Sequence, residues 1–309
     1  MLSWLLYHFM LIPLSWLPLT ILYGFSQLAY WLLYYIIGYR KTVVDENLKL
    51  SFPSLTEKER LAIRKSFYRF LATLLAEAIK NLTISKKQLQ KRLKVINPEL
   101  MDRLYDNNQS VILMSNHFYN WEFLITAQNI LFKHQAIGIG TPLSNGVLNK
   151  LINRQRARFG MHIAHAKNYK TILKSVGNTP TATLVLGDQS PSSIENAYWT
   201  DFLGRETAFF FGAEIMANQN NAAVVYVQFN AVKRGYYTIK LKQITDTPKQ
   251  ESYGYITEQY VKNLACDIRQ NPPYWLWSHK RWKISIPNNL EAIKTNHKKR
   301  FLEKFRDKI

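Results

Sequence analysis

The sequence predicts an α/β fold with a mixed, mostly parallel central sheet flanked by helices, preceded by an N-terminal hydrophobic membrane helix. Short runs rich in Val, Ile, Thr and Tyr alternate with helical stretches along the body of the chain. Most of these runs are bounded by Gly, Asn or Pro. Residues 1–39 contain no Asp, Glu, Lys or Arg, although the whole chain carries a net charge of +20.

The charge-free head is expected to enter a membrane. The segment 19–38, "LTILYGFSQLAYWLLYYIIG", is about long enough to cross ~30 Å of hydrocarbon as a helix. Pro13 and Pro18 are expected to separate it from the preceding apolar run. Arg40 and Lys41 follow at once, and positive charge on that side places the body in the cytoplasm. A helix buried in the protein or lying flat at the interface is the alternative.

The body begins with a helix within residues 51–80. Thr56 is a plausible N-cap because Glu59 follows three residues later, and apolar residues then recur at spacings of three and four. Glu77 lies on this helix and is expected to be an ordinary member of an ion pair, with a site residue as the alternative.

Strands and helices alternate after this helix. The predicted strands are 110–115, 136–140, 161–166, 181–187, 222–229 and 236–244. The predicted helices are 121–133, 145–158, 168–176, 208–219 and 255–270, with a basic amphipathic helix at 296–309. Sites in such sheets gather beyond the carboxyl ends of strands, which here are the loops "MSNHFYN" and "GDQSP".

Composition excludes several classes of protein. The single cysteine, Cys266, makes no intrachain disulfide, fits a reducing compartment, and is expected to be a small buried hydrophobe. The sequence has no glycine pattern of a dinucleotide or P-loop site and no Gly-x-Ser-x-Gly elbow. The basic charge fits an anionic partner, but the apolar head and the lack of a nucleic-acid module argue against nucleic acid.

His117 and Glu122 form the candidate catalytic pair. On one continuous helix a spacing of five would turn the two side chains about 140° apart, so both cannot be helical and cooperate. They can cooperate if His117 lies in the loop after the strand and Asn120 caps a helix that has Glu122 in its first turn. Glu122 would then accept a hydrogen bond from the imidazole and make it a general base for a substrate hydroxyl. A hydrogen-bonded loop histidine is the alternative.

Further residues are candidates for binding a substrate or an oxyanion. Arg158, which precedes Phe-Gly, is the strongest candidate because a guanidinium can donate two parallel hydrogen bonds to a phosphate. Arg156 is a second candidate. Asp188 and Gln189 follow a predicted strand, where Asp188 would orient Arg158 or a substrate hydroxyl, or simply cap the loop. The remaining candidates are Asn116, His279 and Arg281.

The segment "NHFYNWE" resembles the histidine-x4-acid motif of glycerolipid acyltransferases. More closely, the chain resembles the lipid A late acyltransferases, the lauroyl and myristoyl transferases of Gram-negative bacteria. The matching segments, in order, are "RKTVVDENLKLSFPSLTEKER", "RQRARFG", "LVLGDQSP", "FLGRETAFFFGAEIMA" and "PPYWLWSHKRWK". The resemblance covers nearly the whole chain, including its hydrophobic head.

The resemblance implies a glycerolipid-acyltransferase-like fold, with a membrane anchor at 1–39 and an acyltransferase domain at 40–309. It implies transfer of a fatty acyl chain from acyl carrier protein, or acyl-CoA, to a hydroxyl of an anionic lipid A precursor. His117 would be the general base and Glu122 its partner. The implied location is the cytoplasmic face of the bacterial inner membrane, and neither a cofactor nor a metal is implied.

Two other functions are compatible with the same residues. The first is an acyltransferase of this fold with another lipid acceptor, such as an aminolipid, a lysophospholipid or a pigment-linked lipid. The second is a non-catalytic membrane scaffold that binds anionic lipid through its basic surface. The motifs describe the chemistry of transfer and leave the acceptor and the acyl chain length open.

Overall fold

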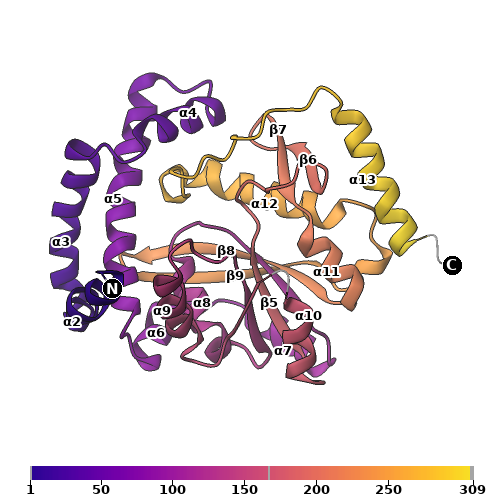
Figure 1. Ribbon diagram of the computed structural model, residues 1–309, viewed down its shortest axis with the longest axis horizontal. Coiled ribbons are helices and arrows are strands. Elements are labelled where there is room, and N and C mark those ends of the chain that lie inside the picture. Colours follow the sequence, from indigo (N-terminus) through magenta and orange to yellow (C-terminus); the bar gives the residue numbers. More distant parts are fainter. Residues whose placement is uncertain (1, 166–167, 307–309) are drawn as a thin grey trace.

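A computed structural model describes residues 2–165 and 168–306 (Figure 1). Ala166, the last residue of the predicted third strand, and residues 307–309 of the predicted tail helix lie outside the described residues. The described residues form one seven-stranded sheet in the order β1-β9-β8-β2-β5-β3-β4 and a separate two-stranded sheet of β6 and β7.

Neighbouring strands of the large sheet run parallel except for β8 and β9, which are antiparallel. The strands are β1 (Leu93–Val95), β2 (Val111–Ser115), β3 (Gln135–Ile139), β4 (His162–Ala164), β5 (Thr181–Leu186), β6 (Ala197–Asp201), β7 (Glu206–Phe210), β8 (Ala223–Lys233) and β9 (Tyr236–Thr245). The predicted mixed, mostly parallel sheet is therefore confirmed. Strand β2 is buried throughout, as expected of a central parallel strand covered on both faces.

Helices cover the sheet on both faces (Figure 1). In the body they are α4 (Lys41–Ser51), α5 (Glu57–Asn81), α6 (Lys86–Arg92), α7 (Glu99–Asp106), α8 (Trp121–Leu131), α9 (Gly146–Ala157), α10 (Tyr169–Val176), α11 (Gly212–Asn220), α12 (Tyr255–Gln270) and α13 (Leu290–Phe305). Short 3₁₀ turns span Pro248–Gln250 and Pro272–Tyr274. Helix α5 begins at the predicted capping box, in which Thr56 and Glu59 satisfy each other's backbone N–H groups.

The head consists of α1 (Leu2–Leu6), a π-helical segment Tyr7–Leu11, α2 (Ile12–Trp16), α3 (Leu19–Trp31) and a second π-helical segment Leu32–Ile36. The helix breaks at Pro18, as predicted. The predicted break at Pro13 was wrong, because the helical backbone continues from Tyr7–Leu11 into α2. Figure 1 shows α3 beside α5 at one side of the molecule, with α13 at the opposite side.

No single helix among the described residues is both long and apolar enough to cross a membrane. The pair Leu19–Ile36 and Lys41–Ser51 meets the length and composition criteria only when taken together, and its two parts are bent by 86°.

Three predictions in the body were wrong. Residues 208–210 belong to strand β7, so the predicted helix 208–219 begins only at Gly212. Cys266 is exposed rather than buried. Glu77 is buried and accepts hydrogen bonds from Tyr23, Asn120 and Tyr237 instead of forming an ion pair.

Candidate active site

The candidate site lies at the carboxyl ends of β2 and β5. These strands are parallel neighbours, with Ser115 paired to Leu186, so the loops that follow them meet at one edge of the sheet. His117 comes from the first loop and Asp188 from the second. The sequence predicted both loops as site loops, and the sheet brings them together.

Asp188 is the partner of the imidazole. His117 Nδ1 lies 2.7 Å from Asp188 Oδ1, and the His117 backbone N–H donates to Asp188 Oδ2 at 2.9 Å. The indole N–H of Trp275 donates to the same Oδ2 at 2.8 Å. Burial alone would raise the pKa of Asp188, but the imidazole and these hydrogen bonds hold it below its ordinary value. A carboxylate at Nδ1 fixes the tautomer and leaves Nε2 as the basic nitrogen.

The predicted hydrogen bond between Glu122 and the imidazole is not found, and this part of the prediction was wrong. Asn120 does cap α8, accepting from the Phe123 N–H at 3.0 Å, and Glu122 does lie in the first turn. The Glu122 carboxylate, however, takes a bidentate pair from Arg156, with Arg156 Nε 3.1 Å from Oε2. Arg156 is therefore paired with Glu122, and its predicted contact with a substrate stays a prediction.

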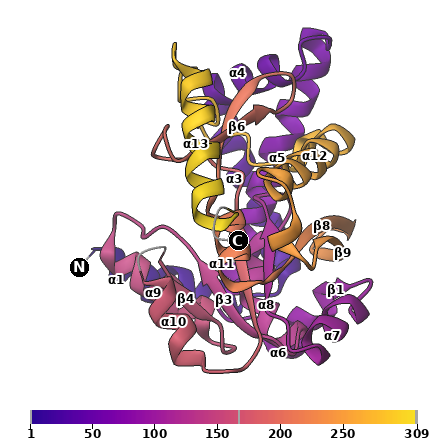
Figure 2. The ribbon, with the colours of Figure 1, turned by 90° about the vertical axis from the view of Figure 1, so that its right-hand side faces the viewer.

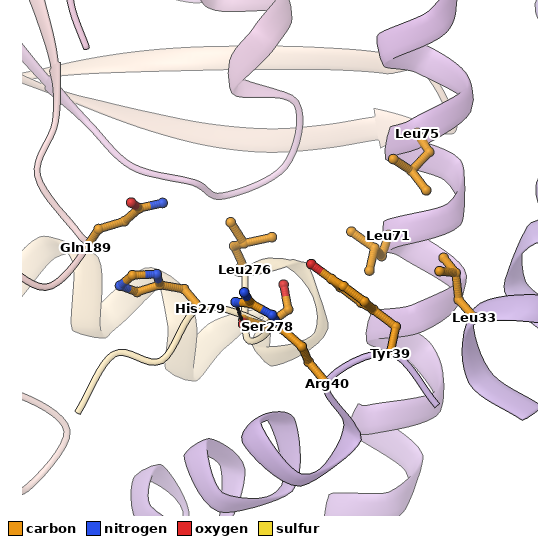
Figure 3. A pocket seen from close by; sticks show the side chains of 9 residues that line it. All are labelled: Leu33, Tyr39, Arg40, Leu71, Leu75, Gln189, Leu276, Ser278 and His279. Carbon is orange, nitrogen blue, oxygen red and sulfur yellow. Dashed lines mark hydrogen bonds between the residues drawn. The ribbon is translucent and has the colours of Figure 1, made fainter. Parts of the chain in front are cut away.

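The other nitrogen of His117 faces Gln189. The two Nε2 atoms lie 3.3 Å apart, and Gln189 also lines a cavity of about 310 Å³. Figure 3 shows Gln189 and His279 at one end of this cavity and leucine side chains at the other. The lining residues are Leu33, Tyr39, Arg40, Leu71, Leu75, Gln189, Leu276, Ser278 and His279. A mostly apolar cavity with polar groups at one end suits a ligand with a long hydrocarbon part.

His279 adds a neutral imidazole to the polar end. The backbone N–H of Ser190 donates to its Nε2 at 3.1 Å, which requires a lone pair on that nitrogen. Burial lowers the pKa of His279 to about 4, so the ring is uncharged near neutral pH. The predicted contact of His279 with a substrate stays a prediction.

Three of the predicted binding residues are engaged within the fold instead. Arg158 donates to the carbonyl oxygens of Asn81, Leu82 and Ile84, at the end of α5. Arg281 is 1% exposed and donates to the Ala208 carbonyl oxygen, with its guanidinium 4.3 Å from the centre of the Phe209 ring. Asn116 is buried and donates to the Tyr226 hydroxyl at 3.0 Å. Each of these side chains thus has hydrogen-bond partners within the protein, and the predicted substrate contacts of the three residues stay predictions.

Sequence reasoning missed what holds the histidine loop in place. Phe118 forms a β-bridge with Trp275, and the Tyr119 N–H donates to the Tyr274 carbonyl oxygen at 3.0 Å. Tyr119 has a left-handed backbone with φ of +50°, and its ring stacks on Tyr274 at 4.6 Å. Such a conformation costs a non-glycine residue about 1–3 kcal/mol, which the buried stacking must offset. The aromatic run 272–277 was visible as a motif, but its contact with residues 118–119 was not.

A polarised imidazole beside an apolar cavity is typical of enzymes that activate a hydroxyl supplied by a substrate. Residues 1–284 match the model of the family described as bacterial lipid A biosynthesis acyltransferase. The chain belongs to this family, whose members are enzymes that transfer acyl groups. Helix α13 lies beyond the matched residues.

Curated relatives agree at low identity. The chain is 22% identical over 273 residues to a lipid A biosynthesis acyltransferase of Haemophilus influenzae, covering 86% of each chain. A second protein of that name from the same organism is 27% identical over 242 residues, covering 72% of this chain and 74% of the relative. The lipid A biosynthesis lauroyltransferase of Escherichia coli K12 is 21% identical over 286 residues, covering 87% and 91%.

Proposed function

We propose that this protein transfers a fatty acyl chain from an acyl thioester, carried by acyl carrier protein or coenzyme A, to a hydroxyl of a lipid A precursor. The reaction would take place at the cytoplasmic face of a bacterial inner membrane. The observation that carries the proposal is the His117–Asp188 contact of 2.7 Å, which leaves Nε2 of the imidazole as the basic nitrogen, facing Gln189 at the end of the cavity.

In this mechanism His117 Nε2 takes the proton of the acceptor hydroxyl. The oxygen attacks the thioester carbonyl, and the carbon–sulfur bond breaks when the tetrahedral intermediate collapses. The proton leaves with the thiol, so no acyl-enzyme is required. Asp188 stabilises the imidazolium that forms in between, as a buried carboxylate on Nδ1 does in other histidine bases.

The amide of Gln189 is the proposed donor to the developing oxyanion. Its Nε2 already lies 3.3 Å from the nitrogen that receives the proton, on the cavity side. Removing an oxyanion donor typically costs about 3–4 kcal/mol of barrier. The net charge of +20 favours both an acidic carrier protein and a phosphorylated acceptor.

The proposal is tested with His117→Ala in membranes supplied with radiolabelled acyl donor and lipid A precursor. Loss of the base should lower the transfer rate by about 10²–10⁴. His162→Ala is the matched control, because His162 is exposed on β4 and outside the site. Unchanged transfer in His117→Ala would remove the base assignment and favour a non-catalytic scaffold.

The acceptor is tested separately by mass spectrometry of total lipids from a deletion strain. We expect lipid A to lose one acyl chain. Intact lipid A together with the loss of an acylated aminolipid, lysophospholipid or pigment-linked lipid would move the same chemistry to another acceptor.

A further inference from the structure

The head of the molecule presents an apolar face that no part of the described residues 2–165 and 168–306 covers. Along α3, Leu19, Leu22, Ser26 and Tyr30 are buried against the body, at the spacing of one helix face. On the other side, Phe25 is 53% exposed, Leu28 is 69% and Trp31 is 55%. The exposed apolar side continues through Trp4, Phe9, Met10, Trp16, Ile21, Leu32, Tyr35, Ile36 and Ile37. A patch this long marks an interaction surface.

The buried face of the head forms hydrogen bonds with charged side chains of the body along its length. Lys80 Nζ donates to the Leu17 carbonyl oxygen at 3.0 Å, and the Tyr23 hydroxyl donates to Glu77 at 2.9 Å. Farther along, Arg234 donates to the Ser26 hydroxyl and Arg64 to the Tyr34 hydroxyl. At its first residues the head meets the body again, where Asn145 donates to the Ser3 hydroxyl and α1 lies beside α9 (Figure 2).

These contacts decide how the head can meet a bilayer. If the docked α3 crossed the hydrocarbon, Glu77, Lys80 and Arg234 would have to follow it or lose their partners. A charged side chain at the centre of a bilayer is strongly disfavoured, because hydrocarbon does not solvate it. Lying in the interface costs none of this, because the charged groups stay on the water side.

Cations mark the depth at which the head would lie. Lys41 Nζ sits 4.2 Å from the centre of the Tyr34 ring, and the guanidinium carbons of Arg69 and Arg234 sit 5.2 Å and 4.0 Å from those of Tyr30 and Tyr23. Tyrosine side chains are enriched at the membrane–water interface, and basic side chains there are attracted to anionic headgroups. We call Lys41, Arg69 and Arg234, which lie beside these tyrosines of the head, the row of cations.

We propose that the head lies in a single leaflet with its first residues on the same side of the membrane as the body. The exposed face of α1–α3 and Leu32–Ile37 enters the acyl region of that leaflet, and the row of cations meets anionic headgroups. The cavity beside His117 is lined by Leu33 of the head and by Tyr39 and Arg40, which follow the head. A lipid would therefore enter the cavity sideways from the leaflet. The inference rests on the membrane location proposed above, and it adds the mode of insertion.

Topology is tested in the full-length protein with two thiols. Cys266, which is exposed in the body, reports the side of the body. In a Cys266→Ser background, a cysteine in a short tag before Met1 reports the side of the head. In spheroplasts treated with a membrane-impermeant maleimide, we expect both thiols to stay unlabelled until the cells are lysed. Labelling of the tag in intact spheroplasts, with Cys266 protected, would mean that the head crosses the bilayer and would overturn the proposal.

The apolar face is tested with the double variant Phe25→Asp/Leu28→Asp. Both side chains are exposed, so the variant should fold. Binding to vesicles of phosphatidylethanolamine and phosphatidylglycerol should fall at least tenfold, while transfer to a detergent-dispersed acceptor persists. Ile286→Asp, an equally exposed apolar residue outside the head, is the matched control. Unchanged vesicle binding in the double variant would show that the head is not the membrane-binding surface. This outcome would overturn the proposal whether or not the protein is an acyltransferase.

Discussion

At the scale of single residues, the proposed chemistry depends on the contact of His117 with Asp188, two positions 71 apart in the chain. The spacing of His117 and Glu122 favoured Glu122 as the partner because only local geometry is visible in a sequence. Asn120 placed Glu122 as expected, but Arg156 from α9 takes the Glu122 carboxylate and Asp188 takes the imidazole. Residue types and loops were thus predictable, whereas the pairing of the two carboxylates with the imidazole and with Arg156 depended on how the sheet is assembled.

We expect Asp188→Asn to lower kcat by about 10²–10⁴ with a smaller change in KM. The amide oxygen can keep the bonds from the His117 N–H and Trp275, but the amide NH₂ would face Nδ1 and force the proton onto Nε2. The base would then be blocked in a folded protein. Steady-state kinetics with thermal unfolding as the folding control would measure this, and a kcat within threefold of wild type would contradict the role of Asp188.

At the scale of elements, helices were easier to predict than the hairpin of β6 and β7. The capping box of α5 and the Asn cap of α8 are local and were found as predicted. The hairpin was missed because its turn uses Leu203 at φ of +55° before Gly204, and its apolar run continues directly into α11. A short apolar run is compatible with either a strand or a helix, and the sequence alone does not show that β6 pairs with β7.

Arg158 connects two helices. It follows the last residue of α9 and donates hydrogen bonds to carbonyl oxygens at the end of α5 and just beyond it. We expect Arg158→Met to lower the free energy of unfolding by about 3 kcal/mol, because carbonyl oxygens that accept from a charged donor would lose it. Chemical denaturation is the measurement. Arg154→Met on the exposed side of the same helix is the control, and equal stability of both variants would contradict this assignment.

At the scale of the whole molecule, α13 closes one side of the fold through a buried histidine. His297 contacts the Tyr253 hydroxyl at 2.6 Å and packs on Phe211 at 4.7 Å between ring centres. Burial lowers the pKa of His297 to about 4, so the folded state binds fewer protons than the unfolded state between about pH 4 and 6.5. Stability from this group is therefore complete above the unfolded pKa and is lost as the pH falls through that window.

His297→Phe should remove this dependence, because phenylalanine suits the aromatic surroundings and does not titrate. Relative to wild type, we expect the variant to gain stability as the pH falls from about 6.5 to 4. Denaturation midpoints of both proteins across that range measure the difference. Parallel pH curves for the two proteins would show that His297 titrates alike in the folded and unfolded states.

The cavity beside His117 has one further consequence. Leu33, Tyr39 and Arg40 come from the head and its turn, while Leu71 and Leu75 come from α5 behind it. A shortened chain that starts after residue 40 would thus carry an intact imidazole over a cavity with one wall removed. In the proposed function, such a preparation would report the reactivity of the histidine loop but not the preference for a fatty acid. Under that proposal, engineering of chain-length preference begins with the residues of the head that line the cavity.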